Sequence, residues 1–281
     1  TAYYLTRSGI QTTILEARRI GSGQTSGTTA KITAQHNLIY QKLITCFGEG
    51  DARMYASANQ QAIKEYSRLI HSHSIDCDFR EASACLYTRL AGDSLQQEYK
   101  AASWLGIPAK LSTDTELPFS VRNALYFPHQ AQFHPLKFLY QLAEKLKIYE
   151  NTFVKKIDGD IAFTDKGSIK FKQAIVASHF PFINTHGWFF IKMYQKRSYV
   201  MALQVESKLN GTFIDDKEEG FYFRNYNDLL IVGKGEHRTG CKTKALEQLK
   251  DFKEKFYPDA EVKTLSTRWS IYREKTEKAA G

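Results

Sequence analysis

The sequence contains no long apolar run. In 281 residues, no stretch approaches the roughly 18 consecutive apolar residues that a membrane-spanning helix needs, and no charged segment followed by an apolar one opens the chain as a leader peptide would. We therefore expect a cytoplasmic protein with no membrane partner.

Cysteine is scarce, and its spacing excludes several kinds of site. The four cysteines include no C-x-x-C pair, which argues against a disulfide framework and against zinc or iron–sulfur sites built from local pairs. His71 and His73 precede Cys77 at a predicted helix end, but no carboxylate completes a ligand set, so we expect no metal. The predicted state is free, buried thiols at Cys46, Cys77, Cys85 and Cys241.

Acidic residues are outnumbered by basic ones, giving a formal charge of +9. A basic balance is compatible with nucleic acid, an anionic membrane or anionic ligands such as phosphates. Between residues 242 and 263, however, the lysines alternate with Asp and Glu, the pattern of a solvated helix face. We expect no nucleic-acid partner; the alternative, a basic nucleic-acid binder, predicts an affinity that falls steeply with salt.

The most informative stretch lies near the start of the chain. Gly9 is predicted to end a helix, residues 12–15 form a short buried strand, and Glu16 stands at the carboxyl end of that strand. In a dinucleotide-binding βαβ unit, an acidic residue about 20 positions after the glycine-rich turn accepts hydrogen bonds from the ribose. Counting back from Glu16 places that turn before residue 1, so the chain is expected to begin inside the first helix.

A loop rich in Gly, Ser and Thr follows this strand at residues 21–29. Small residues let backbone approach a ligand closely, and hydroxyls offer it hydrogen-bond donors. We interpret the loop as covering a cofactor; the alternative is a flexible surface loop.

Downstream, helical and extended patterns alternate before an antiparallel region. The run of apolar residues 174–177 suits a strand buried on both faces of a parallel sheet. A hairpin turn is predicted at residues 225–228. One helix is predicted over residues 39–72, with a break at 48–50, and further helices are predicted at 92–105, 135–146 and 246–256. A meander of strands is predicted over residues 152–171. The other predicted strands are 78–90, 198–206, 212–215, 220–225, 229–233 and 263–272.

Several short motifs, in this order, resemble the FAD-dependent amine and amino-acid oxidoreductases of the D-amino-acid oxidase and glycine oxidase type. The likeness extends over residues 1–270 and is greatest to bacterial members whose full-length forms often carry an added Rieske domain. No Rieske pattern of paired Cys and His occurs here. The motifs are residues 14–23, 28–36, 133–135, 175–182, 197–199, 233–240 and 268–270.

This resemblance implies an α/β fold in which an incomplete Rossmann-like FAD-binding domain is interleaved with an α+β substrate domain built on an antiparallel sheet. The expected FAD-binding segments are residues 1–45 and 128–182, and the expected substrate-domain segments are 46–127 and 183–272, followed by an irregular tail at 273–281.

The resemblance also implies roles for individual residues. Glu16 would hold the adenosine ribose beside Ala17 and Arg18. The implied contacts along the pyrophosphate and toward the flavin are Ser22, Gly23, Thr28, Thr29, Ala30 and Lys31, with Val154 at the adenine and Ala177 and Ser178 approaching from the sheet; plain core packing is the alternative for Val154 and Ala177. On the substrate side, the candidates are Tyr199, His237 and Trp269 as catalytic residues and Arg197 or Arg238 for a substrate carboxylate, with an ordinary surface charge as the alternative for each arginine.

The predicted function is oxidation of a small amine or amino acid by hydride transfer to FAD. Two departures from the family pattern support a different reading: the glycine-rich phosphate loop is not in the sequence, and residues 272–281 do not fit the segment that closes over the flavin. The alternative is therefore a non-catalytic remnant or binding protein that cannot hold FAD.

Overall fold

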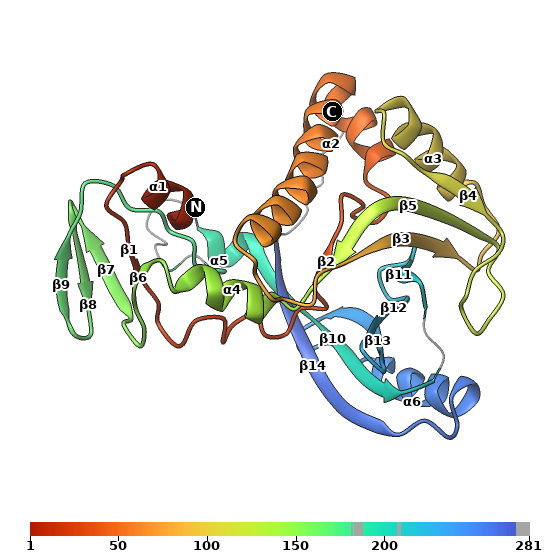
Figure 1. Ribbon diagram of the computed structural model, residues 1–281. Helices are drawn as coiled ribbons and strands as arrows, with labels where there is room; N and C mark the ends of the chain where they lie inside the picture. The colour runs from red at the N-terminus through yellow and green to blue at the C-terminus, as the bar shows by residue number, and fades with distance from the viewer. Residues whose placement is uncertain (181, 183–187, 207–208, 274–281) are drawn as a thin grey trace. The chain divides into compact units, whose positions relative to one another are not determined.

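A computed structural model describes residues 1–180, 182, 188–206 and 209–273, with the side chains of 189–190, 236 and 268–273 left out of the description. The chain divides into two compact units (Figure 1). The first comprises Thr1–Thr28, Pro135–Lys196 and Trp269–Gly281, and the second Thr29–His134 and Arg197–Arg268. This division groups residues 29–45 and 128–134 with the second unit, whereas the sequence assigned them to the FAD-binding domain; that assignment stays a prediction.

The first unit contains a short parallel sheet and a separate meander. Strand β1 pairs in parallel with β6, Ile14 opposite Ile148, and the three-stranded meander β7–β8–β9 is antiparallel, as predicted. Its described helices and strands are α1 (Ala2–Arg7), β1 (Thr13–Leu15), α4 (Pro135–Ala143), β6 (Lys147–Tyr149), β7 (Val154–Asp158), β8 (Ile161–Thr164), β9 (Gly167–Lys170) and α5 (Phe189–Lys192).

The strand predicted at residues 174–177 is wrong. These residues form neither helix nor strand, and the side chains of Ile175 and Val176 are 63% and 44% exposed. A buried strand needs a neighbour to pair its backbone groups, and within the described residues the parallel sheet consists of β1 and β6 alone.

The second unit is built on a nine-stranded mixed sheet, ordered β14-β10-β13-β12-β11-β3-β5-β2, with β4 pairing β5 off this path. Among the pairs in this sheet whose register is described, only β3 and β11 run parallel. The strands are β2 (Lys31–Ile32), β3 (Arg80–Thr88), β4 (Lys110–Ser112), β5 (Asn123–Gln132), β10 (Met193–Gln204), β11 (Gly211–Asp215), β12 (Phe221–Tyr226), β13 (Leu229–Arg238) and β14 (Val262–Arg273), of which β10 and β14 begin or end in the first unit.

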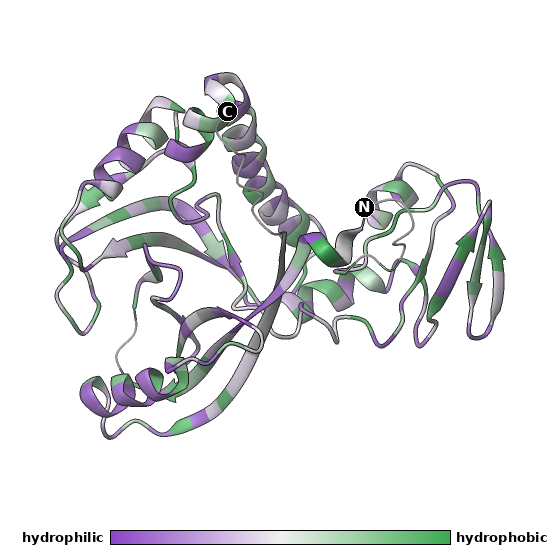
Figure 2. Ribbon diagram, turned by 180° about the vertical axis from the view of Figure 1, so that it is seen from behind, coloured by the Kyte–Doolittle hydropathy of each residue, from purple (hydrophilic) through white to green (hydrophobic). Residues whose placement is uncertain are grey.

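Alternation along β3 separates two hydrophobic cores. Because successive side chains of a strand point to opposite faces, Ala84 and Leu86 join one core while Cys85 and Tyr87 join the other. Helices α2 (Tyr40–Ser72) and α3 (Ser94–Trp104) cover the first face, and α6 (Ala245–Phe256) covers the second. Polar and apolar residues alternate along α2 and α6 in Figure 2, as expected for helices with one buried face.

Other predictions are confirmed locally. The predicted break in the long helix falls at Gly48, whose φ of +83° and ψ of 169° interrupt α2, and the 225–228 hairpin turn joins β12 to β13 around Asn227 at φ +53°. The expectation of four buried thiols is half wrong. None of the four cysteines forms a disulfide, but Cys46 and Cys241 are exposed, whereas Cys77 and Cys85 are buried. The tail expected at 273–281 lies outside the described residues, apart from Arg273, which ends β14.

Candidate functional site

In the first unit, Glu16 is fixed at the carboxyl end of β1 by three hydrogen bonds. Its backbone N–H donates to the Tyr149 carbonyl at 2.9 Å, and its carbonyl accepts from the Thr152 N–H at 2.8 Å. The carboxylate Oε1 accepts from the Arg18 backbone N–H at 2.8 Å. Oε2 has no partner among the described residues, so one carboxylate oxygen is available at the strand end predicted to hold a ribose.

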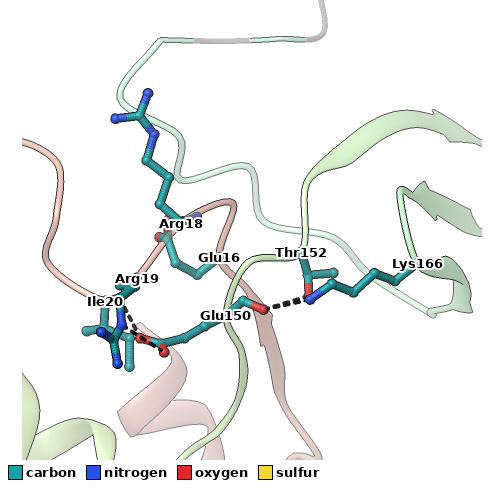
Figure 3. A network of polar contacts seen from close by, with 7 residues as sticks. All are labelled: Glu16, Arg18, Arg19, Ile20, Glu150, Thr152 and Lys166. Carbon is teal, nitrogen blue, oxygen red and sulfur yellow. Dashed lines mark hydrogen bonds and ion pairs between the residues drawn. The ribbon is translucent and has the colours of Figure 1, made fainter.

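The loop after Glu16 is held by Glu150, a residue that the sequence analysis missed (Figure 3). The Glu150 carboxylate accepts from the Ile20 backbone N–H at 2.7 Å, and the Asn151 N–H donates to the Arg18 carbonyl at 2.8 Å. Arg19 lies 4.0 Å from the same carboxylate, but its side chain is 83% exposed, so this ion pair contributes little. No local pattern reveals Glu150, because it acts on a loop 130 residues earlier.

The Gly/Ser/Thr loop is ordered around Gly21, which has a φ of +73°. The conformation therefore favours glycine, and a Cβ there would also lie 2.5 Å from Leu136 Cδ2, at the far end of a side chain in α4 that would have to shift. Ser22, Gly23 and Thr28 are exposed on this loop, as a cofactor-covering role needs. The Gln24 side chain reaches inward, and its Nε2 is buried without a hydrogen-bond partner. A buried unpaired donor is costly, which makes Gln24 a candidate for binding an acceptor atom.

The other candidates of the first unit are spread over three segments. Val154 begins β7, pairs with Thr164 and is half-buried. Ala17 and Arg18 are exposed after β1. Ala177 and Ser178 are exposed in the segment that forms no strand. All of these residues except the half-buried Val154 are thus exposed, and their predicted roles stay predictions.

In the second unit, Thr29 and Ala30 are buried and lead into β2, which starts at Lys31. The carbonyls of Thr29 and Ala30 both accept hydrogen bonds from Nη1 of Arg224, the second at 2.9 Å. The Lys31 ammonium lies 5.2 Å from the centre of the Tyr222 ring, a cation–π distance. Arg224 and Tyr222 lie on β12, and neither is among the candidates predicted from the sequence.

Two of the substrate-side candidates meet on adjacent strands. The rings of Tyr199 (β10) and His237 (β13) stack with centroids 5.8 Å apart and planes inclined by 11°. His237 Nδ1 is buried and has no hydrogen-bond partner among the described residues. Arg197 is exposed near the same end of β10. Trp269 lies within β14, but its side chain is outside the described residues.

Two absences concern metals and membranes. Among the described residues, no group of three or more His, Cys, Asp and Glu side chains is arranged to hold a metal ion. Within the same part of the chain, no helix is long and apolar enough to cross a membrane.

Comparisons with solved structures identify the fold. Glycine oxidase from Geobacillus kaustophilus superposes with a TM-score of 0.71 at 17% identity, covering 97% of this chain and 79% of that one. L-proline dehydrogenase from P. horikoshii gives a TM-score of 0.75 at 18% identity, covering 99% of this chain and 79% of that one. This chain therefore has the α/β fold of these structures, with a large mixed, curled sheet.

Sequence comparisons identify the family. The family model described as DAO, FAD dependent oxidoreductase, matches residues 1–278. A putative Rieske 2Fe-2S iron–sulfur protein of Bacillus subtilis (strain 168), YhfW, is 35% identical over 256 residues, covering 85% of this chain. The chain spans 50% of the length of that relative. The family implies FAD as the cofactor, and the chain belongs to the DAO family of FAD-dependent oxidoreductases.

Proposed function

We propose that this chain oxidises an amine or an amino acid with FAD as the hydride acceptor. The observation that carries the proposal is the position of Glu16, whose carboxylate is held by the Arg18 amide and keeps Oε2 available at the end of a parallel strand. Two of the similar solved structures are named as a glycine oxidase and an L-proline dehydrogenase. Both names denote enzymes acting on a carbon that bears nitrogen, which supports the same substrate class here.

The residues of the first unit fit the adenosine and phosphate part of FAD. Glu16 would accept hydrogen bonds from the ribose hydroxyls, beside Ala17 and Arg18, and Val154 would contact adenine. The buried Nε2 of Gln24 supplies a donor that lacks an acceptor in the protein, as a group facing a phosphate oxygen would. Contacts to the rest of the cofactor are proposed for Ser22, Gly23, Thr28, Ala177 and Ser178.

The second unit supplies candidates for the reacting end. Thr29, Ala30 and Lys31 are proposed to face the flavin ring, which when bound would accept the hydride. His237, held flat against Tyr199, has a buried Nδ1 that can exchange a hydrogen bond with a substrate amine. Arg197 would pair with a substrate carboxylate through its two-pronged donor geometry, and Trp269 is proposed as a further substrate contact.

A specific observation favours the rival function, a binding protein that holds no flavin. The parallel sheet of the first unit has only two strands among the described residues, and the apolar run at Ile175 and Val176 is exposed beside no strand. A sheet of that size offers little rigid support for a cofactor. The rival predicts a folded chain that carries no flavin absorption once excess FAD has been removed by gel filtration.

Titration of the purified chain with FAD, followed by flavin fluorescence, tests the proposal. Replacing Glu16 by Ala removes hydrogen bonds to a charged acceptor, each worth about 1.5–3 kcal/mol, so the Kd should rise about 10- to 100-fold. The matched control is Glu144→Ala, because Glu144 is an exposed carboxylate of the same unit. Equal affinities for the two variants would refute the role of Glu16.

A further inference from the structure

Arg224 is a buried arginine that binds backbone far away in the sequence. Arg224 lies on β12 and is 4% exposed. Its Nη1 donates to the carbonyls of Thr29 and Ala30, which precede it by 195 and 194 residues. One guanidinium nitrogen therefore holds two consecutive peptide groups in place.

No carboxylate of the described residues compensates the charge of Arg224, whose guanidinium faces two backbone carbonyls and lies 5.8 Å from the centre of the Tyr226 ring. Burial lowers the pKa of Arg224 to about 10, an effect partly opposed by the nearby Tyr226, so the side chain stays protonated at neutral pH. Within the described part of the chain, it forms no ion pair, and its Nε is buried without a hydrogen-bond partner. A buried cation without a carboxylate is expensive. Ordinary packing needs no such group, since an apolar side chain of similar size would fill the same space.

The two carbonyls belong to a turn with an unfavourable backbone. Ala30 has a φ of +49°, in the left-handed region that residues with a Cβ avoid. In a trans peptide the C=O and the N–H point in opposite directions. By holding the Thr29 and Ala30 carbonyls on its own side, Arg224 thus sets the direction of the Ala30 and Lys31 amides.

The arrangement also joins strands that are far apart in the sheet. Strand β2, which follows Ala30, is the last in the order β12-β11-β3-β5-β2, yet the residues leading into it contact β12. The Arg224 contact therefore closes the curl of the sheet at the turn that enters β2. The Ala30 carbonyl also accepts from the Phe133 N–H at 3.4 Å, so loss of the Arg224 contact would loosen the turn while the pairing of β2 with β5 stays.

We infer that Arg224 is a positioning residue that locks the 29–31 turn in the conformation needed to meet the flavin. The inference rests on the proposed function, in which Thr29, Ala30 and Lys31 face the flavin ring. Arg224 lies outside the motifs that carry the family resemblance, and the positioning role gives a reason for a buried cation on β12.

The first test measures the turn itself, without cofactor. Arg224→Met replaces the guanidinium by an unbranched apolar side chain, and Arg80→Met is the matched control because Arg80 is an exposed arginine on β3 of the same sheet. Amide hydrogen exchange in the cofactor-free protein should rise at least tenfold at residues 29–33 in Arg224→Met and stay unchanged in Arg80→Met. Exchange in α3 should be the same in both variants.

The second test measures cofactor binding and separates positioning from general stability. Arg224→Met should bind FAD about tenfold more weakly and shift the visible flavin band, whereas Arg224→Lys should recover part of the affinity by donating to one carbonyl. Adding Ala30→Gly to Arg224→Met removes the left-handed strain and should recover about threefold in Kd. A purely structural arginine would lower the melting temperature with no change in FAD affinity and no rescue by Gly.

The outcomes distinguish the two claims. Unchanged exchange at residues 29–33 in Arg224→Met overturns the inference, whatever the wild type binds. Wild type that binds no FAD, combined with faster exchange in Arg224→Met, refutes the proposed function and leaves Arg224 as the lock of the turn. If Arg224→Met does not fold, the measurements use Arg224→Lys and the double variant Arg224→Met with Ala30→Gly. An FAD affinity within twofold of wild type in both variants overturns the inference.

Discussion

Removal of the Glu98 side chain should destabilise the second unit strongly. Glu98 lies in α3 and is fully buried, and its carboxylate accepts the first backbone N–H groups of α2: Oε1 from Ile39 at 2.9 Å and Tyr40 at 2.8 Å, and Oε2 from Gln41 at 3.0 Å. The carboxylate therefore acts as the N-terminal cap of α2, which has no side-chain cap of its own at Ile39.

The magnitude follows from opposing contributions. Three hydrogen bonds to a charged group are worth about 1.5–3 kcal/mol each, but burying the carboxylate costs several kcal/mol, and burial raises the pKa of Glu98 despite those three donors. Glu98→Ala leaves three backbone donors without their carboxylate, one of them buried and two part-buried, and opens a cavity, for a net loss of about 3–5 kcal/mol. At about 2–4 °C per kcal/mol for a unit of this size, the melting temperature should fall by roughly 6–20 °C.

Urea unfolding followed by circular dichroism measures this loss directly. Gln96→Ala is the control, because Gln96 is exposed on the same helix and differs from Glu98 in having no buried partner; it should change the free energy of unfolding by less than about 0.5 kcal/mol. A loss below about 1 kcal/mol for Glu98→Ala would refute the reasoning, since it would mean that α2 starts without the Glu98 cap.

Three further predictions concern packing, charge and thiols. Gly233→Ala should cost about 1–3 kcal/mol in chemical unfolding, because the new Cβ would lie 1.9 Å from the Tyr222 ring, whereas Gly50→Ala, with no atom within 4 Å of its Cβ, should not destabilise. Burial and, less strongly, the charge of Asp216 raise the pKa of Asp215, so the stability that Asp215 contributes is complete below about pH 4 and is lost as the pH rises through the raised pKa. Asp215→Asn should therefore have a higher urea midpoint than wild type at pH 7 but not at low pH. A difference that does not change with pH would contradict the raised pKa. A thiol reagent should label Cys46 and Cys241 rapidly in the folded protein, and Cys77 and Cys85 only after unfolding. Burial also raises the pKa of Cys85 to about 12, which slows its reaction. Four rapidly labelled thiols in the folded protein would disprove the burial.

Local patterns in the sequence predicted most elements of the fold. The glycine break of α2 at Gly48, the start of α4 at Pro135, the meander and the β12–β13 turn each depend on residues close together in the chain. Turn residues and side-chain periodicity act over a few positions, so a single sequence reveals them.

Contacts between distant segments could not be predicted in this way. Glu150 holds a loop 130 residues before it, and Arg224 holds a turn 195 residues before it; neither residue has a sequence neighbour that indicates its partner. The wrong strand at residues 174–177 has the same origin. An apolar run becomes a strand only beside a paired neighbour, and that condition is set by tertiary structure.

The central claim, that this chain binds FAD and uses it to oxidise an amine or amino acid, is tested most directly by visible absorption spectroscopy of the chain reconstituted with FAD. We expect a protein-bound flavin band that survives gel filtration and bleaches without oxygen when a small amino acid or amine is added. A folded, colourless protein after gel filtration would contradict it.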